Sequence, residues 1–196
     1  MSDTVILVLN CGSSSIKFAL FDATRHPLPR EPNWNGKVDG IGGPSAALSE
    51  TGLAPQRLEL DATHPHTDAL DRILERVEHR LQGRTLLAVA HRVVHGGQRY
   101  HAPILVTQAV IDDLRKIIPL APLHQPFPLK AMAILLQQYP ELPQIACFDT
   151  AFHHDLPEVE QALPLPYAFG QRGLRRYGFH GLSYEYMRHA LPERYG

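Results

Sequence analysis

The chain has 196 residues, 44% of them hydrophobic, and its 19 Lys and Arg against 20 Asp and Glu give a formal net charge of −1. This length can bury a sizeable core, and the balanced charge gives no electrostatic reason to expect nucleic acid or an anionic membrane as a partner. Cys11 and Cys147 are too far apart in the sequence for a zinc motif and too few for a disulfide framework, which favours a cytoplasmic protein. We expect no signal peptide and no membrane-spanning helix, because no apolar run is long enough.

The first part of the chain predicts three strands. Val5–Leu9 is a continuous aliphatic run, typical of a strand that is buried on both faces. Ile16–Phe21 follows almost at once, and Asn35–Gly43 is a third strand that ends in a glycine turn. Residues 44–66 contain prolines and have little pattern, so we expect an excursion with one strand at Arg57–Leu60.

Helical spacing of apolar residues then predicts three amphipathic helices, which we place at residues 67–83, 110–118 and 126–139. Thr67 or Asp68 can cap the first helix, and Gly83 can end it. Buried strands are expected between these helices and after them, at residues 86–90 and 144–149.

This order of elements predicts an α/β fold with a mixed sheet, because three consecutive strands are followed by alternating helices and strands. The start of the sheet should be antiparallel and its continuation parallel. From Ala151 the sequence becomes rich in proline and glycine, and only a short helix at residues 183–191 is expected. We therefore predict one domain over residues 1–150, and over residues 151–196 a linker with the beginning of a second domain.

The first strand is followed by Asn-Cys-Gly and three serines, which suggests a phosphate site. The spacing does not fit a P-loop, because Lys17 lies inside the second strand instead of at the start of a helix. The loop should be a hairpin whose donors are backbone N–H groups near Gly12, serine hydroxyls and the Lys17 ammonium. Glycine and serine are also ordinary turn residues, so the loop alone leaves a plain hairpin turn open.

Three further polar residues, Arg92, Asp149 and His180, strengthen the phosphate interpretation. Like Asn10, Arg92 and Asp149 each fall at the end of an expected buried strand, where ligands gather in open sheets. His180 follows later, between aromatic residues and glycines. Singly, Arg92 could be a surface ion pair, Asp149 a helix cap and His180 a core histidine. Together they offer what phosphoryl transfer needs, which is cationic groups, a carboxylate for magnesium and amides around a phosphate.

The segments LNCGSSSIKF and HRVVHGG resemble the two signature segments of the acetate kinase family, with its propionate and butyrate kinase relatives. PLAPLH, FDTAFH and RRYGFHG resemble the family's intervening blocks, in the same order. The resemblance implies a ribonuclease H-like domain of the actin-like ATPase fold. It also implies reversible, ATP-dependent phosphorylation of acetate to acetyl phosphate, with Mg²⁺ or Mn²⁺ as the metal.

The resemblance implies a role for each matching residue. Asp149, Arg92 and His180 would be catalytic, and Asn10 and Asp149 would hold the metal. The phosphate groups would lie against Gly12, Ser13, Ser15, Lys17 and His124. The acyl group would lie against Arg92, Val94, Leu123 and Phe179.

Chemistry alone limits what Asp149 can do. The acceptor is a carboxylate, whose pKa of roughly 4–5 leaves it ionised at neutral pH, so no general base is needed. We therefore expect Asp149 to act mainly as a metal ligand or to orient a metal-bound water.

Family members are roughly twice this length, so the match corresponds to their N-terminal half. We expect this chain alone to turn over ATP and acetate poorly, and the full-length protein to be a homodimer. Gln125, Leu182 and Tyr184 stand where the family usually has Asn, Thr and His, which leaves the acyl preference open. A non-catalytic module that binds acyl phosphate or phosphate remains an alternative, as does a propionate or butyrate kinase. A sugar kinase or Hsp70-like relative is disfavoured by HRVVHGG and YGFHG.

Overall fold

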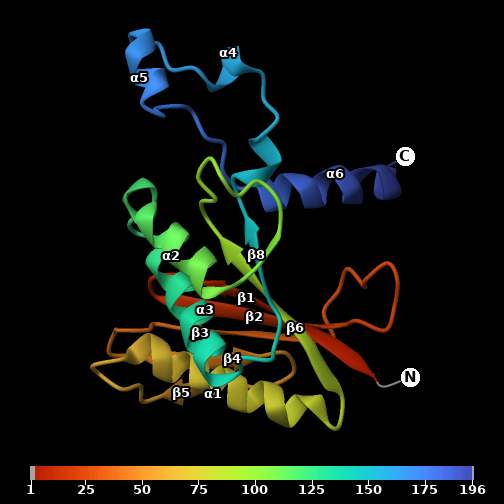
Figure 1. Cartoon of the computed structure of the whole chain (residues 1–196). Coiled ribbons are helices and arrows are strands. Elements are labelled where there is room, and N and C mark those ends of the chain that lie inside the picture. The colour runs from red at the N-terminus through yellow and green to blue at the C-terminus, as the bar shows by residue number, and fades with distance from the viewer. Residues whose placement is uncertain (1–2, 196) are drawn as a thin grey trace.

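A computed structural model describes residues 3–195 of the chain. An eight-stranded sheet forms its centre, with the strand order β5-β4-β3-β2-β1-β6-β8-β7 (Figure 1). The strands are β1 (Thr4–Cys11), β2 (Ser15–Asp22), β3 (Trp34–Asp39), β4 (Ala46–Glu50), β5 (Gln56–Leu58), β6 (Thr85–Val93), β7 (Ile104–Leu105) and β8 (Gln144–Phe148).

The sheet is mixed, as the sequence predicts. Strands β1 to β5 pair with one another in chain order and antiparallel. Strands β6 and β8 continue the sheet parallel to β1, and β7 adds an antiparallel edge. The prediction of an antiparallel start and a parallel continuation is therefore confirmed.

Three strand predictions need correction. The segment 44–66 holds two strands, β4 and β5, and β4 is absent from the prediction because its sequence AALSE has low strand propensity. Burial of Ala46 and Leu48 outweighs that propensity. Strand β7 was not expected, since two residues carry no readable period. Strand β6 extends to Val93, so Arg92 lies within the strand and not after it.

The helices are α1 (Pro65–Leu81), α2 (Gln108–Lys116), α3 (Pro126–Gln138), α4 (Glu158–Gln161), α5 (Tyr167–Gln171) and α6 (Gly181–Tyr195), with 3₁₀ turns η1 (Ile118–Leu120) and η2 (Ala151–His153). Helix α1 begins at Pro65, so the prediction of a cap at Thr67 or Asp68 is wrong. Proline suits a first helical turn because its φ is preset and its missing N–H is not needed there. The first helix ends as expected, with Gly83 at a φ of 87°. Helices α4 and α5 are short additions, and α6 is longer than predicted.

Helices α1 and α3 cover one face of the sheet (Figure 1). Alternation along β1 sends Val5, Leu7 and Leu9 into the core on that face. A second cluster joins α2 and α3 to the ends of β6 and β8. The intervening residues of β1, which include Asn10, point to the opposite face and stay partly exposed. The polar residues at the strand ends are therefore carried on the face away from α1 and α3.

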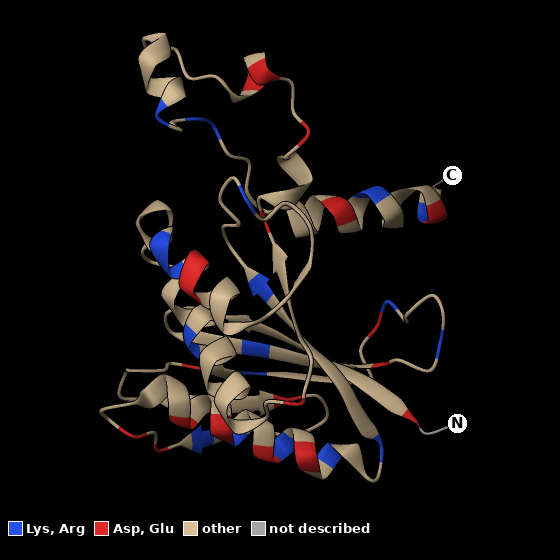
Figure 2. Cartoon of the chain, viewed as in Figure 1, with Lys and Arg blue, Asp and Glu red and all other residues tan. Residues whose placement is uncertain are grey.

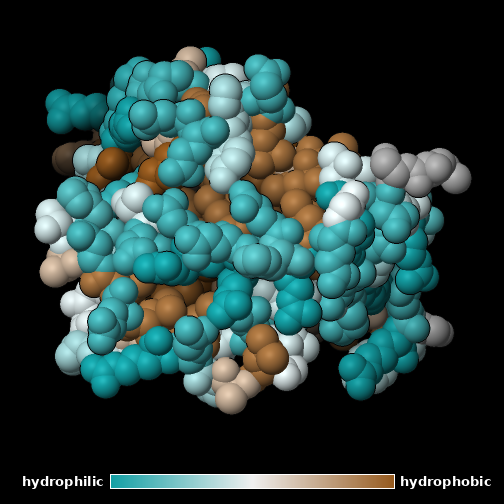
Figure 3. Space-filling model, turned by 90° about the horizontal axis from the view of Figure 1, so that it is seen from below, coloured by the Kyte–Doolittle hydropathy of each residue, from teal (hydrophilic) through white to brown (hydrophobic). Residues whose placement is uncertain are grey.

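Residues 155–180, which include α4 and α5, extend away from the sheet, and α6 crosses close to η2 and β8 (Figure 1). Arg30, in the loop after β2, reaches α6 through an ion pair with Glu193 at 2.5 Å. Acidic and basic residues alternate along α1 and α6 (Figure 2). Seen from below, the surface is mostly hydrophilic, with apolar residues reaching it between the polar ones (Figure 3). Among residues 3–195, no helix combines the length and apolar character needed to cross a membrane.

A buried polar pair lies in the core between the sheet and α3. The Nε2 atom of His91 is 2.9 Å from Oε1 of Gln144, and Gln144 donates to the carbonyl of Met132. Since Oε1 only accepts, Nε2 of His91 carries the proton. Burial lowers the pKa of His91 from 6.5 to about 4, so the ring is neutral in the folded protein at neutral pH.

We expect His91 to make the fold sensitive to acid. Between pH 6.5 and about 4 the unfolded chain binds a proton that the folded chain does not, so stability falls as the pH is lowered through that range. The full effect is about 3 kcal/mol. Urea unfolding at pH 7 and pH 4.5 measures it, and His91→Gln should remove this part of the pH dependence. An unchanged pH dependence in His91→Gln would contradict the assignment.

Candidate active site

The candidate site is centred on Arg92, whose guanidinium bridges two other strands. Its Nη2 lies 2.5 Å from Oδ2 of Asp149, and its Nε lies 3.1 Å from the same oxygen and 3.3 Å from Oδ1. Its Nη1 donates to Oδ1 of Asn10 at 3.2 Å. The Asp149 side chain is only 3% exposed, whereas that of Arg92 is 32% exposed. The three strand-end residues therefore meet, with the buried carboxylate neutralised by a cation that solvent still reaches.

The sheet register brings these residues together. Leu9 lies opposite His91 in the parallel pairing of β1 and β6, so Asn10 and Arg92 follow as neighbours on one face. Asp149 comes directly after β8, and its N–H donates to the carbonyl of Val93 at 2.9 Å. Thr150 accepts from the Gly96 N–H at 3.0 Å and ties together the loops that follow β6 and β8.

Lys17 lies on the same face of the sheet as Asn10 and Arg92. It pairs with Asn10 in the antiparallel register of β1 and β2, which places both side chains on one face. Lys17 is exposed and lies within β2, as the sequence predicts. The row across the sheet is therefore Lys17, Asn10 and Arg92, with the Asp149 carboxylate bound to its last member.

The serine hairpin between β1 and β2 presents unused backbone donors. Gly12 closes the turn by donating to the carbonyl of Ser15 at 2.8 Å. The carbonyl of Ser13 lies 2.9 Å from Nε2 of His66, and that of Ser14 accepts from the Ile41 N–H. Within residues 3–195 the N–H groups of Ser13 and Ser14 donate to no protein group. Free N–H groups beside a lysine can bind an anion.

His66 makes a contact with the hairpin that the sequence does not reveal. In the structure its ring also stacks on Phe127 in the first turn of α3, with the centroids 4.9 Å apart. His66 therefore links the hairpin to two helices. The partners are 53 residues apart, so no local pattern signals the contact.

Gln125 has a definite structural role. It is fully buried, its Oε1 accepts from the His95 N–H at 3.2 Å, and its Nε2 donates to the His95 carbonyl at 2.9 Å. One amide side chain thus satisfies both backbone groups of a buried residue in the loop after β6. The sequence shows Gln125 only as a departure from the family's usual Asn and does not indicate this pairing.

The three residues expected around an acyl group differ in their placement. Val94 is partly buried and precedes His95, whose ring packs edge-on against Phe179 at 5.7 Å. Leu123 is 74% exposed, on the loop before Gln125. The structure thus associates Val94 and Phe179 with His95, and leaves Leu123 in solvent. Burial lowers the pKa of His95, so the ring is neutral at neutral pH, and its Nδ1 accepts from the Gly97 N–H at 2.8 Å.

The two other predicted histidines lie on loops. His180 is exposed and has a φ of 58°, and the N–H of the following Gly181 donates to the Asp149 carbonyl at 2.8 Å. This bond brings the backbone at His180 next to Asp149. His124 is exposed on the loop before α3, and its N–H donates to Ala121.

Neither cysteine is suited to act as a nucleophile. Burial raises the pKa of the Cys11 thiol to about 12. Burial also raises the pKa of Cys147, which lies opposite Arg92 in the pairing of β6 and β8. Both thiols therefore stay protonated at neutral pH.

The residues present fit a magnesium ion that is shared with a phosphate. Among the described residues, no group of three His, Cys, Asp or Glu side chains could hold a metal by itself. Mg²⁺ commonly binds through one or two protein oxygens and completes its shell with water and phosphate. The carboxylate of Asp149 and the amide oxygen of Asn10, which both contact the guanidinium of Arg92, are oxygens of the kind that such an ion takes.

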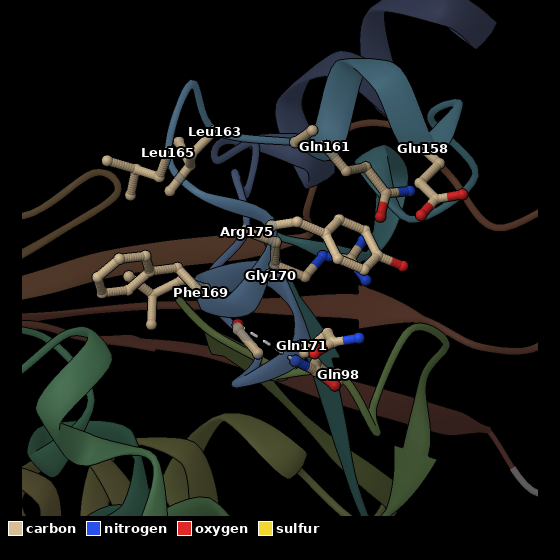
Figure 4. Close-up of a pocket in the computed structure, with 13 residues that line it drawn as sticks. Gln98, Glu158, Gln161, Leu163, Leu165, Phe169, Gly170, Gln171 and Arg175 are labelled. Carbon is tan, nitrogen blue, oxygen red and sulfur yellow. Dashed lines mark hydrogen bonds between the residues drawn. The ribbon is translucent and has the colours of Figure 1, made fainter.

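A cavity of about 570 Å³ lies elsewhere, around α4 and α5 (Figure 4). Its lining includes Gln98, Glu158, Phe169 and Arg175 but none of the predicted site residues. Gln98 closes one side by donating to the Gly173 carbonyl at 3.3 Å. The polar row on the sheet and this cavity are therefore separate features.

The sheet order, with helices α1 and α3 on one face and a polar cluster where β6 and β8 end, places the chain among proteins of the actin-like ATPase fold. Over residues 5–195 the sequence matches the acetokinase family. The chain belongs to this family.

Individual relatives agree with this assignment. An acetate kinase from Rhodopseudomonas palustris is 46% identical over 98% of this chain, which corresponds to 49% of the relative. A crystal structure of the Porphyromonas gingivalis acetate kinase superimposes with a TM-score of 0.78 at 35% identity. The match covers 92% of this chain and 46% of the chain in that crystal structure. A propionate kinase from Francisella tularensis superimposes with a TM-score of 0.80 at 33% identity. This match covers 94% of this chain and 47% of the propionate kinase chain. The chain spans about half the length of the curated relatives it matches.

Replacing Gln125 with alanine should destabilise the protein by about 2–4 kcal/mol, because two buried backbone groups of His95 would lose their partners. Urea unfolding measures the loss, and Gln138→Ala, at the exposed C-terminal end of α3, is the matched control. If Gln125→Ala cost no more than the control, the proposed anchoring of the loop after β6 would be wrong.

Proposed function

We propose that the protein transfers a phosphoryl group between ATP and a short-chain carboxylate, with acetate as substrate and acetyl phosphate and ADP as products, in both directions. The observation that carries this proposal is the row of Lys17, Asn10 and Arg92 beside the buried carboxylate of Asp149. Its relatives are named acetate kinase, and the likeness to a propionate kinase keeps a longer acyl group as an alternative.

The main obstacle in this reaction is that two anions must approach each other. Arginine has five N–H donors, and the contacts to Asp149 and Asn10 occupy three of its nitrogens. One hydrogen on each terminal nitrogen has no partner among these contacts, and the Arg92 side chain is 32% exposed. These N–H groups would be the donors to a carboxylate or a phosphate. Arg92 would thus bind the acyl carboxylate and stabilise charge during transfer.

Lys17 and the free N–H groups of Ser13 and Ser14 would bind the phosphate, with Gly12 and the Ser15 hydroxyl in the same turn. His124 and His180 would approach the phosphoryl group from their loops. Asn10 and Asp149 would hold Mg²⁺, which would supply positive charge to the phosphates when bound. Asp149 needs no role as a base, because the acceptor carboxylate is already ionised.

The acyl group would lie against Val94 and Phe179, beside the neutral ring of His95. Leu123 would join this pocket only if its loop moves, since its side chain is 74% exposed. A pocket of this kind sorts chain length only modestly, because one methylene is worth about 1–3 kcal/mol.

We further propose residues 1–150 as the acyl- and phosphate-binding domain and residues 151–196 as a linker with the beginning of the nucleotide domain. The extension of residues 155–180 away from the sheet supports this division (Figure 1). The whole protein would act as a cytoplasmic homodimer. A non-catalytic module that binds acyl phosphate is the alternative of another class.

Replacing Arg92 with alanine in the full-length protein should raise the KM for acetate and lower kcat by a factor of about 10²–10³. The reason is that both the carboxylate contact and charge stabilisation are lost together. Arg92→Lys should restore little, because an ammonium cannot replace the planar fork. Trapping of acetyl phosphate as hydroxamate measures both constants, and Arg115→Ala on α2 is the control. An unchanged kcat in Arg92→Ala would refute the transition-state role.

The 196-residue chain by itself should bind acetyl phosphate but turn it over with ADP very slowly. Calorimetry with acetyl phosphate and the hydroxamate assay on the same sample separate the two properties. A kcat typical of metabolic enzymes, about 10 s⁻¹, would show that the chain needs no further part. Absence of binding would count against both the kinase and the binding-module proposals.

A further inference from the structure

His153 lies between two parts of the candidate site, and the proposed reaction gives it no role. It ends η2, the 3₁₀ turn that begins two residues after Asp149. The sequence suggests only a loop histidine at the surface. In the structure, its ring makes contacts that set the position of the loop that carries His180.

The first contact is a hydrogen bond. Nε2 of His153 lies 3.0 Å from the carbonyl oxygen of Phe179, the residue before His180. A carbonyl oxygen can only accept, so Nε2 carries the hydrogen. The imidazole therefore acts as a donor from η2, the turn that begins two residues after Asp149.

The second contact is steric. The His153 ring lies so close to Gly178 that a Cβ atom there would be 2.2 Å from Cγ of the ring. On another side, Tyr184 packs edge-on against the ring, with the centroids 5.4 Å apart. The ring thus fits between the loop before His180 and the first turn of α6.

His180 is consequently fixed on both sides. The residue before it is bonded to His153 through Phe179, and the residue after it, Gly181, donates to the Asp149 carbonyl at 2.8 Å. His180 has a φ of 58°, which is an uncommon conformation for a residue other than glycine. Such a backbone persists where its surroundings determine it, and these two bonds act together with those that the His180 carbonyl accepts from Ser183 and Tyr184.

We propose that His153 is a positioning residue, which acts through its bond to the Phe179 carbonyl to hold His180 beside Asp149 and Arg92. Only the expected effect of His153 on the rate of turnover rests on the proposed function. The geometric part of the proposal concerns the loop alone and can be tested without any substrate.

The experiment compares His153→Ala with His153→Gln. The amide nitrogen of glutamine can occupy the place of the imidazole Nε2 and donate to the same carbonyl, so it should preserve the loop. His154→Ala is the matched control, because the neighbouring ring stacks on His101 and makes no contact with residues 177–181 among the described ones. Gly178→Ala provides a second perturbation, since its methyl group would push the His153 ring away.

The first readout is hydrogen exchange at the Gly181 amide, measured by NMR. His153→Ala and Gly178→Ala should accelerate it at least tenfold, while His153→Gln and His154→Ala should leave it near the wild-type rate. Equal rates in all variants would overturn the proposal, whatever the protein's activity. If His153→Ala does not fold, Gly178→Ala and His153→Gln still decide the outcome.

The second readout is the rate of turnover by the full-length protein and by its variants. His153→Ala should lower kcat by about 10²-fold, as expected for a misplaced catalytic group, with the KM for acetate nearly unchanged. His153→Gln should restore most of the loss. A KM effect with an unchanged kcat would contradict a role through His180. A wild-type protein without kinase activity would refute the proposed function, and the exchange result would still stand by itself.

Discussion

The arrangement of the site depends on one ion pair, between Arg92 and the buried carboxylate of Asp149. A carboxylate that is 3% exposed would be costly without a partner, and Arg92 supplies three contacts to it. The same guanidinium reaches Asn10, so one side chain joins the ends of three strands. Since the Arg92 side chain is still 32% exposed, the interaction that makes the buried acid tolerable also leaves cationic donors for an anionic ligand.

The loops around this ion pair are held by hydrogen bonds between side chains and backbone groups, and not by packing against a large apolar cluster. Gln125 fixes both polar groups of His95, and Thr150 binds the loop after β6 at Gly96. A Cβ at Gly96 would lie 1.9 Å from the Tyr100 carbonyl, so this crossing requires glycine. The site is thereby built on strand ends whose connecting loops are held by hydrogen bonds, and the loop of His180 is held to Asp149 in the same way.

Much of this could be predicted from sequence. The aliphatic run at Val5–Leu9, the amphipathic helices and the polar strand ends have local signals, and the convergence of Arg92 with Asp149 followed from the rule that ligands gather at strand ends. Strand β4 was missed because burial outweighs the weak strand propensity of its residues. The contacts of His66, Gln125 and His153 were missed for another reason. Each joins segments between 26 and 53 residues apart, so only the tertiary fold brings them together.

The central claim is that an anionic substrate binds on the row of Lys17, Asn10 and Arg92. A crystal structure of the protein grown with acetate and phosphate measures this most directly. Acetate oxygens should lie within hydrogen-bond distance of the terminal nitrogens of Arg92, and phosphate should lie at Lys17 and the N–H groups of Ser13 and Ser14. Both anions bound only in the cavity near Arg175, with Arg92 contacting nothing but Asp149 and Asn10, would contradict it.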